Sequence, residues 1–237
     1  GTLSEVLPLL TEALDKQDHS DWKAEINTFK RPFNQLQIGD FVNPQTLIEA
    51  VDSKTPDDAI VVTDVGQHQL WAAQFYKFKK PHTLLSSGGL GTMGYSMGAA
   101  IGAALGCPGR RVVMFTGDGG FHMNLTELAT MASYNVPVVM FVMNNRVLGM
   151  VRQWQKIFYG NRFSDTDPHR ATDFVKVAEA FGVKGLRINT NEEINSVLDE
   201  AFQVNGPVVV ECRISPDSNV LPMIPPGGSV ADIKEEM

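Results

Sequence analysis

The chain has 237 residues, of which 43% belong to the hydrophobic class and 20% are charged, and its formal net charge is −7. These values are typical of a globular protein with a sizeable core, and an acidic chain without a basic stripe gives no support for nucleic-acid binding. The sequence contains no apolar run of about 18 residues and no signal peptide, so it predicts neither a membrane span nor secretion, and Cys107 and Cys212 are expected to be reduced thiols.

The first part of the chain predicts two helices. Residues 3–14 carry apolar side chains at helical spacing, in which Pro8 fits well only if it lies in the first turn. A second helical pattern covers residues 22–29. Because residues 1–38 offer no core of their own, and because the chain opens on Gly1 within a helical pattern, we expect this part to be a tail or the end of an upstream domain.

From residue 43 onward, helical and strand patterns alternate. Strands are predicted over residues 59–63, 82–85, 112–116, 138–143, 183–188 and 207–214. Helices are predicted over residues 44–51, 67–76, 95–105, 124–134, 148–158, 172–181 and 191–203. Strands separated by helices require an α/β fold, and we expect a doubly wound, six-stranded parallel sheet with helices on both faces. The expected domains are residues 1–35, 36–215 and an irregular tail, 216–237.

Polar residues follow two buried strands of this predicted sheet. Asp118 follows the strand at 112–116, and Asn144 and Asn145 follow the strand at 138–143. Because the carboxyl ends of parallel strands lie side by side, we expect Asp118 and Asn145 to be close together. Carboxylate and amide oxygens next to glycine backbone suit Mg²⁺ and phosphate. The alternative is an Asp turn and an Asn helix cap, each common by itself.

A glycine-rich loop over residues 86–94 follows the second predicted strand. Gly89, Gly91 and Gly94 match the G-x-G-x-x-G pattern, which is typical of dinucleotide-binding sites. The match is not at the first strand, however, and the next acidic residue, Asp118, is embedded between glycines. A tight loop followed by close helix packing therefore remains an alternative interpretation.

Two further segments carry candidate side chains. Gln67 and His68 open a predicted helix, where they can donate hydrogen bonds to an anion, although a packed histidine is the simpler interpretation of His68 alone. Met150 and Trp154 are four residues apart and share a helix face, which can line a ligand pocket or pack in the core. We assign structural roles to His122 and His169.

In this order, the segments resemble the diphosphate-binding domain of thiamine-diphosphate enzymes. That family's motif is Gly-Asp-Gly, a gap, and then Asn-Asn, and it is matched here by residues 117–119 and 144–145. Within the family, the sequence is similar to that of the catalytic subunit of acetohydroxyacid synthase. The matching runs are residues 65–74, 87–95, 149–155 and 220–223, and the resemblance extends from about residue 36 to the C-terminus.

The resemblance implies how the cofactor's charged end is held. It assigns Mg²⁺ to Asp118, to the side chain of Asn145 and to the backbone carbonyl of Val147. The diphosphate would be surrounded by Gln67, His68, Gly119, Gly120, Leu148 and Gly149, and Val65, Gly66 and Gly117 complete this part of the implied site. Gly120 and the pair Arg146-Val147 stand where relatives vary, which leaves only their fine positioning open.

The resemblance also assigns the cofactor's other end. Met93 would wedge under the cofactor and hold it bent, and Gly91 and Met150 would line the pyrimidine side. Trp154, together with Met150, would shape the pocket for the second 2-ketoacid and favour 2-ketobutyrate. The implied activity condenses pyruvate with a second 2-ketoacid after loss of CO₂, the first common step of branched-chain amino-acid biosynthesis.

The resemblance also implies two domains of the enzyme that we do not expect within these 237 residues. The family uses a Glu from a separate pyrimidine-binding domain to activate the cofactor and a middle domain to hold FAD, so we assign no catalytic residue here and expect the chain alone to be inactive. The resemblance further implies a homo-oligomer, a possible small regulatory subunit, and a cytoplasmic enzyme of bacterial type or one in an organelle.

Three alternatives remain open from the sequence. The first is another thiamine-diphosphate enzyme, a 2-ketoacid decarboxylase or oxidase. The second is a nicotinamide-dependent oxidoreductase that uses the glycine-rich loop over residues 86–94. The third is a non-catalytic interaction module.

Overall fold

The computed structural model describes residues 1–30 and 37–235. The chain divides into two compact units, residues 1–34 and residues 35–237. The domain boundary that we expected between residues 35 and 36 lies outside the described residues. Within the described residues, no helix is long and apolar enough to cross a membrane.

The first unit contains α1 (Leu3–Ala13) and α2 (Ser20–Phe29), as predicted. Thr2 and Glu5 form a capping box at the start of α1. Pro8 lies in the interior of α1 and not in the first turn, where a proline fits well. The proline leaves the Ser4 carbonyl without its usual helix partner, and the exposed helix continues past it. No residue of α1 or α2 is buried, which agrees with the prediction that this segment has no core.

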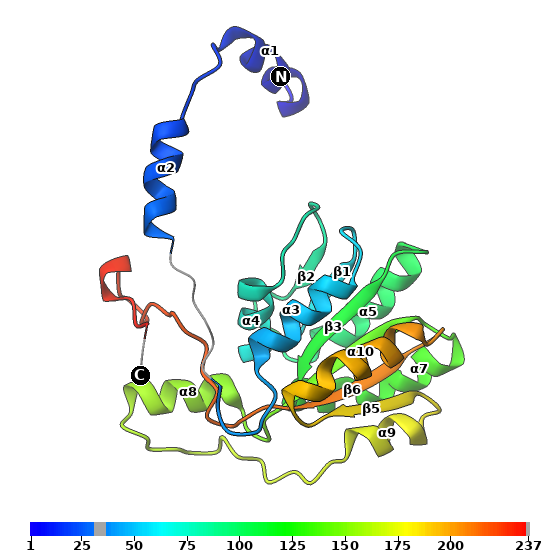
Figure 1. Ribbon diagram of the computed structural model, residues 1–237. Helices are drawn as coiled ribbons and strands as arrows, with labels where there is room; N and C mark the ends of the chain where they lie inside the picture. The colour runs from blue at the N-terminus through cyan, green and yellow to red at the C-terminus, as the bar shows by residue number, and fades with distance from the viewer. Residues whose placement is uncertain (31–36, 236–237) are drawn as a thin grey trace. The chain divides into compact units, whose positions relative to one another are not determined.

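The second unit is built on a six-stranded sheet with strand order β2-β1-β3-β4-β6-β5 (Figure 1). Every neighbouring pair is parallel, which confirms the predicted α/β fold. The strands are β1 (Ile60–Thr63), β2 (Leu84–Ser86), β3 (Val112–Gly117), β4 (Val138–Asn144), β5 (Lys184–Ile188) and β6 (Val208–Arg213). All residues of the central strand β4 are buried, as a parallel strand covered on both faces requires.

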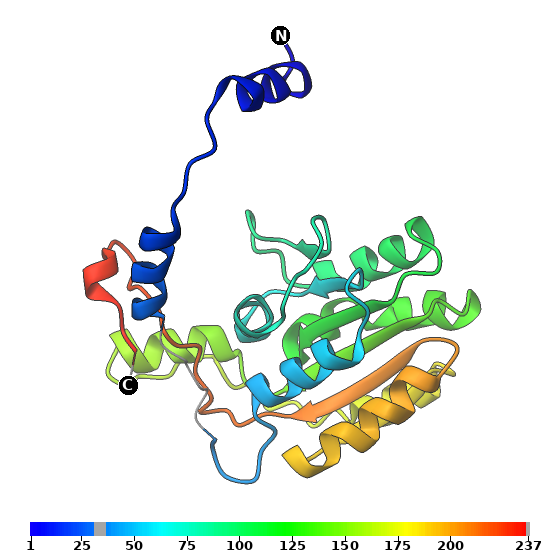
Figure 2. The ribbon, with the colours of Figure 1, turned by 45° about the horizontal axis from the view of Figure 1, so that its top comes forward.

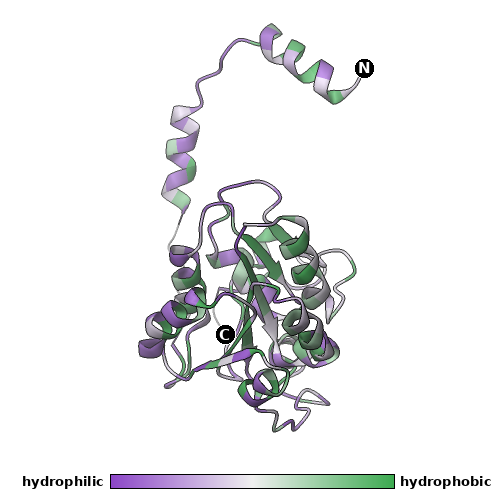
Figure 3. Ribbon diagram, turned by 90° about the vertical axis from the view of Figure 1, so that its right-hand side faces the viewer, coloured by the Kyte–Doolittle hydropathy of each residue, from purple (hydrophilic) through white to green (hydrophobic). Residues whose placement is uncertain are grey.

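Helices cover both faces of the sheet (Figures 1 and 2). One face packs against α5 (Tyr95–Gly106), α7 (Leu128–Ser133) and α9 (Phe174–Ala180), whose buried side chains join one hydrophobic cluster with those of the central strands. The opposite face is covered by α3 (Pro44–Lys54), α4 (Gln67–Phe75) and α10 (Ile194–Gln203). Figure 3 shows hydrophobic residues concentrated on the strands between these layers. Alternate strand residues therefore serve two cores.

The remaining elements lie in the connections between strands and in the C-terminal tail. They are α6 (Asp118–Asn124), η1 (Leu125–Glu127), α8 (Gly149–Phe158), η2 (Asn191–Glu193) and η3 (Val230–Asp232). We predicted one helix over residues 124–134, but a helix already begins at Asp118 and passes through η1 into α7. The prediction was wrong at this end because two glycines follow Asp118, and glycine has a low helix propensity. The irregular tail contains one isolated antiparallel bridge, between Met223 and Lys234.

The strand order creates a crevice at the carboxyl edge. The connection after β1 leads to β2 on one side, and the connection after β3 leads to β4 on the other. Because the chain leaves these adjacent strands in opposite directions, their carboxyl ends open a gap, which is where such sheets bind ligands. Cys107 and Cys212 are free thiols, as expected.

Candidate functional site

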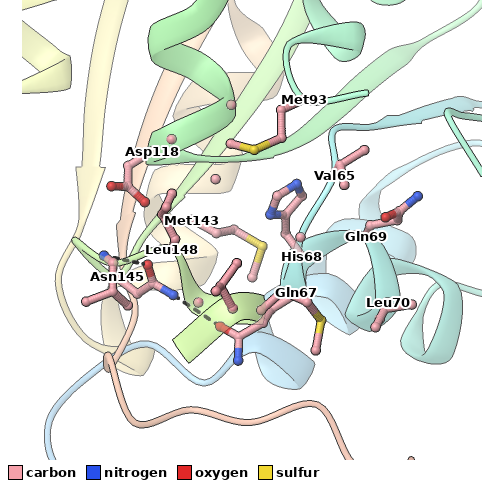
Figure 4. Close-up of a pocket in the computed structure, with 18 of the residues that line it drawn as sticks. Val65, Gln67, His68, Gln69, Leu70, Met93, Asp118, Met143, Asn145 and Leu148 are labelled. Carbon is pink, nitrogen blue, oxygen red and sulfur yellow. Dashed lines mark hydrogen bonds between the residues drawn. The ribbon is translucent and has the colours of Figure 1, made fainter. Parts of the chain in front are cut away.

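A pocket of about 290 Å³ lies at the carboxyl ends of β1, β3 and β4 (Figure 4). The loops and helix starts that follow these three strands supply most of its lining, and Met93 reaches it from the glycine-rich loop. Its lining residues are Val65, Gly66, Gln67, His68, Gln69, Leu70, Trp71, Met93, Gly117, Asp118, Gly119, Gly120, Met143, Asn145, Val147, Leu148, Gly149, Met150 and Val151. The structure thus brings together nearly all the predicted cofactor residues, although they are distant in sequence.

Three helices begin at this pocket. The first residues of α4, α6 and α8 are Gln67, Asp118 and Gly149, and all three line it. The first N–H groups of a helix have no partner within the helix, and its dipole is positive at this end. Three N-termini directed at one pocket therefore favour an anion, and a diphosphate fits this arrangement.

Asp118 is the one carboxylate among the lining residues of this pocket in the described chain. Its side chain is buried, and burial raises its pKa to about 6, against the lowering effect of backbone hydrogen bonds, including one from Gly119, and of the charges on Arg170 and Arg146. Figure 4 shows Asp118 and Asn145 on the same side of the pocket. A buried carboxylate whose ionised form is disfavoured gains from a cation beside it.

Asn145 is held by two hydrogen bonds. Its amide nitrogen donates to Oε1 of Gln67 at 3.1 Å, and its amide oxygen accepts from the backbone N–H of Val147 at 3.1 Å. The described residues contain no cluster of three or more His, Cys, Asp or Glu that could hold a metal ion. A metal here would therefore combine the Asp118 carboxylate with amide and carbonyl oxygens, a donor set that Mg²⁺ accepts.

His68 provides a buried polar atom that has no partner among the described residues. The side chain is buried, its ring points into the pocket (Figure 4), and its Nε2 atom has no hydrogen-bond partner among the described residues. Burial lowers the pKa of His68 to about 4, although Asp64 opposes this shift, so the ring is neutral at pH 7. A buried polar atom left unpaired is available to a ligand.

Gln67 behaves differently from the expectation that its side chain donates to an anion. Its amide nitrogen donates to Oε1 of Gln153 at 2.9 Å and to the carbonyl of Ser218 at 2.7 Å. Both donors are therefore used within the protein. Gln67 lines the pocket, but its side chain ties the start of α4 to α8 and to the C-terminal tail.

Two glycines allow side chains to pass close to the backbone. A Cβ atom on Gly149 would lie 2.1 Å from Oε1 of Gln67, and one on Gly120 would lie 2.2 Å from Oδ1 of Asp64. Neither distance is possible without movement of these side chains. The glycines after the Asp and Asn motifs therefore make room for the polar side chains that organise the pocket.

Asp64 organises the site, although no role was predicted for it. It is fully buried, and its carboxylate accepts hydrogen bonds from the backbone of Gly94 at 3.0 and 3.1 Å and from the backbone and hydroxyl of Ser96 at 3.1 and 2.7 Å. It thus holds the loop that carries Met93. Its position at a strand end was visible in the sequence, but its partners, about 30 residues away, were not.

Two predicted residues lie outside this pocket. Gly91 is exposed, with φ of +62°, and does not line it. Trp154 lines a separate apolar pocket, which it shares with Met150, Leu70 and the C-terminal tail. Met150 belongs to both pockets and connects them. His122 donates or accepts only within the protein, contacting the Asp118 carbonyl and the Thr172 hydroxyl.

The family model described as "Thiamine pyrophosphate enzyme, C-terminal TPP binding domain" matches residues 64–212. The chain belongs to this family of thiamine pyrophosphate enzymes. The matched segment contains all three strand-end loops and the glycine-rich loop. The family's description names this domain as one that binds thiamine pyrophosphate, which is thiamine diphosphate.

Relatives in the thiamine pyrophosphate enzyme family include acetolactate synthases. The chain is 41% identical to the "Probable acetolactate synthase large subunit" of Methanococcus aeolicus, over 92% of this chain and 38% of that protein. It is 42% identical to the "Acetolactate synthase large subunit" of Pyropia yezoensis, over 98% of this chain and 40% of the relative. It is 41% identical to the "Acetolactate synthase catalytic subunit, mitochondrial" of Saccharomyces cerevisiae, over 94% of this chain and 33% of that protein. The chain thus spans less than half the length of these relatives.

The structure of a thiamine diphosphate-dependent enzyme is also similar. It is the thiamine diphosphate-dependent 4-hydroxybenzoylformate decarboxylase of Rhodococcus jostii RHA1, with a TM-score of 0.72 and 28% identity. The match covers 80% of this chain and 36% of the decarboxylase chain. The fold is therefore shared with this thiamine diphosphate-dependent decarboxylase.

Proposed function

We propose that this chain is the cofactor-binding part of an acetolactate synthase, and that it binds thiamine diphosphate through Mg²⁺. The observation that carries the proposal is the pocket at the switch point of the sheet, where Asp118 and Asn145 meet three helix N-termini. The names of the relatives support acetolactate synthase over other members of the family. The whole enzyme's activity is part of the proposal, because the chain covers 33% to 40% of these relatives.

The residues of the pocket fit the charged end of the cofactor. The Asp118 carboxylate, the Asn145 amide oxygen and the Val147 carbonyl would hold Mg²⁺. The N-termini of α4, α6 and α8 would receive the diphosphate, and His68, whose Nε2 atom has no partner among the described residues, would face the bound cofactor. Glycine at positions 119 and 149 keeps the backbone accessible on this side.

The apolar residues of the pocket would hold the remainder of the cofactor and the substrates. Met93 lies on the opposite side of the pocket from Asn145 (Figure 4), where it would support the bent cofactor. Met150 and Trp154 form an apolar wall that would bind the side chain of a second 2-ketoacid and exclude water from it. Bound thiamine diphosphate supplies the electron sink that lets pyruvate lose CO₂ and its remaining carbons join pyruvate or 2-ketobutyrate.

Several further expectations belong to the same proposal. They are FAD and a cofactor-activating Glu in other parts of the enzyme, a homo-oligomeric assembly, a small regulatory subunit, and a place in branched-chain amino-acid biosynthesis. We place the enzyme in the cytoplasm, with an organelle as the alternative, since one relative is named mitochondrial.

Ligand-dependent thermal stability tests the cofactor assignment. We expect thiamine diphosphate to raise the melting temperature only when Mg²⁺ is present. At a ligand concentration of 100 times Kd, binding should add about 2.7 kcal/mol to the free energy of unfolding. Asp118→Ala should abolish this shift. Asp57→Ala, which removes an exposed carboxylate paired with Lys79, should preserve it.

The other outcomes would contradict the proposal in different ways. Stabilisation by NAD without Mg²⁺ would favour a nicotinamide-dependent oxidoreductase that uses the glycine-rich loop. Unchanged binding by the Asp118→Ala variant would favour an interaction module. If the complete enzyme released an aldehyde from pyruvate and formed no acetolactate, it would instead be a 2-ketoacid decarboxylase.

A further inference from the structure

A buried carboxylate lies beside the Asn pair, outside the residues assigned to the cofactor. Glu211, near the carboxyl end of β6, is 5% exposed. Its Oε1 atom accepts a hydrogen bond from the amide nitrogen of Asn144 at 2.7 Å. Its Oε2 atom accepts two from Arg187, from Nε at 3.0 Å and from Nη2 at 2.9 Å. Both carboxylate oxygens are therefore used, each by a different partner.

Asn144, which Glu211 holds in place, is also hydrogen-bonded to the turn that follows β4. Its side chain is buried, and its amide oxygen accepts a hydrogen bond from the backbone N–H of Arg146 at 3.1 Å. Arg146 has φ of +60°, in the left-handed region. A residue with a Cβ atom adopts this conformation at a cost of roughly 1–2 kcal/mol, so other interactions must hold it. The Asn144 side chain supplies one of them.

The turn determines where two of the proposed metal ligands lie. Asn145 and Val147 flank Arg146, and the Val147 N–H donates to the Asn145 amide oxygen at 3.1 Å. If Arg146 left the left-handed region, the backbone carbonyl of Val147 and the side chain of Asn145 would move relative to Asp118. The position of the Asn144 side chain is therefore linked to the geometry of the site.

The network crosses three neighbouring strands. In the sheet register, Glu211 of β6 pairs with Arg187 of β5 on one side and with Val142 of β4 on the other. Arg187 also forms an ion pair with Asp173, with 2.6 Å between Nη2 and Oδ1. Asp173 therefore contacts the arginine of this network and not Asn144. The guanidinium offsets the charge of the buried Glu211, and the second carboxylate oxygen remains available to orient Asn144.

We propose that Glu211 is a positioning residue for the metal-binding turn, acting through Asn144 and supported by Arg187. This inference rests on the proposed binding of Mg²⁺ and thiamine diphosphate. A glutamine could not replace the carboxylate, because its NH₂ group would face either the Asn144 amide or the Arg187 guanidinium, which are both donors. Orientation of metal ligands by such outer partners typically changes metal affinity by about 10- to 100-fold.

Calorimetric titration of thiamine diphosphate at varied Mg²⁺ concentrations tests this role in the 237-residue chain. We expect Glu211→Gln to weaken the apparent Mg²⁺ affinity by about 10- to 100-fold. Asn144→Ala should produce a similar loss, and the double variant should lose no more than either single variant, because the two residues act in series. Asp173→Asn is the matched control, with an expected change of less than about threefold.

A second readout does not depend on the cofactor. Hydrogen exchange in the ligand-free chain should be faster over residues 144–148 in Glu211→Gln than in the wild type, with β1 and β3 unchanged. If Glu211→Gln does not fold, Asn144→Ala serves the same purpose, since it leaves the ion pair between Arg187 and Glu211 intact.

Failure of the inference can be distinguished from failure of the proposed function. A wild-type chain without Mg²⁺-dependent binding would overturn the proposed function and, with it, the metal-positioning role. Normal wild-type binding together with wild-type Mg²⁺ affinity in Glu211→Gln and Asn144→Ala would overturn the inference alone. Unchanged exchange over residues 144–148 in both variants would also overturn it.

Discussion

Burial gives Asp118 an unusual proton affinity for a residue proposed to hold a metal. Its pKa in the folded chain is about 6, above the ordinary value of 3.8. A carboxyl group whose pKa is raised on folding contributes stability fully below pH 3.8 and loses it as the pH rises through about 6. At neutral pH the ligand-free site therefore holds a carboxylate in an unfavourable environment, which a divalent cation relieves.

This proton affinity predicts a pH dependence of Mg²⁺ binding. Because a metal binds the carboxylate and competes with its proton, the apparent affinity should fall about tenfold for each pH unit below about 6 and level off above it. Calorimetry of Mg²⁺ and thiamine diphosphate binding between pH 5 and pH 8 measures this slope. An affinity that is constant across that range would contradict the assignment of Asp118 as a ligand.

Gly149 predicts a local loss of binding. In Gly149→Ala the new Cβ would lie 2.1 Å from Oε1 of Gln67 and 2.6 Å from Nδ2 of Asn145, so the hydrogen bond between these side chains must break. We expect a destabilisation of about 1–3 kcal/mol and weaker Mg²⁺-dependent cofactor binding, measured by urea unfolding and calorimetry.

Gly98 provides the control for this substitution. It lies within α5, and a Cβ there would meet no atom within 4 Å. Gly98→Ala should therefore stabilise the chain by about 0.5–1 kcal/mol through helix propensity, without changing binding. Equal effects of the two substitutions on unfolding free energy and on cofactor binding would show that Gly149 has no special packing role.

At the scale of elements, a single side chain joins β1 to the start of α5. The Asp64 carboxylate accepts N–H groups of Gly94 and Ser96, which are otherwise unpaired at the helix N-terminus. It also accepts the Ser96 hydroxyl at 2.7 Å. The end of the loop that carries Met93 is therefore anchored to the end of β1.

Asp64→Asn should weaken this link. The amide offers one acceptor oxygen, and its NH₂ group would face the donors of Gly94 or Ser96. We expect a loss of about 2–4 kcal/mol in urea unfolding. Ser96→Ala, which removes only the hydroxyl contact, should cost about 1 kcal/mol. If Asp64→Asn were as stable as the wild type, the carboxylate would not hold the loop.

At the scale of the whole molecule, the pocket contains one part of the chemistry that the proposed reaction needs. Among its lining residues in the described chain, Asp118 is the only carboxylate, and we assign it to Mg²⁺. No second carboxylate is left there to exchange a proton with the cofactor. On the proposed function, the described site would bind and orient the cofactor, and we expect the group that activates it to come from another part of the enzyme.

We therefore predict that the purified 237-residue chain forms no acetolactate from pyruvate. The assay would supply thiamine diphosphate, Mg²⁺ and FAD, with cofactor binding verified in the same sample. Acetolactate formation above the level of an Asp118→Ala preparation would refute this prediction. Binding without turnover would agree with a site that holds one end of the cofactor.

The sequence by itself determined the alternation of strands and helices, because hydrophobic periodicity depends on neighbouring residues. It also placed Asp118 and Asn145 at strand ends, and the order of a parallel sheet made their proximity predictable. It did not reveal that α6 begins at Asp118, since local glycine propensity favours a loop there. Patterns among neighbouring residues were sufficient to predict the elements whose formation depends mainly on local interactions.

Only the tertiary structure decided which polar partners organise the site. The contact between Asn144 and Glu211 joins residues 67 apart, and the contact between Asn145 and Gln67 joins residues 78 apart. Neither follows from composition or spacing, because such contacts depend on strand order and on how neighbouring strands are aligned. Tertiary packing likewise used the Gln67 amide within the protein and left His68 Nε2 unpaired in the pocket. Which buried polar atoms remain available to a ligand is settled only when the whole chain has packed and satisfied the others.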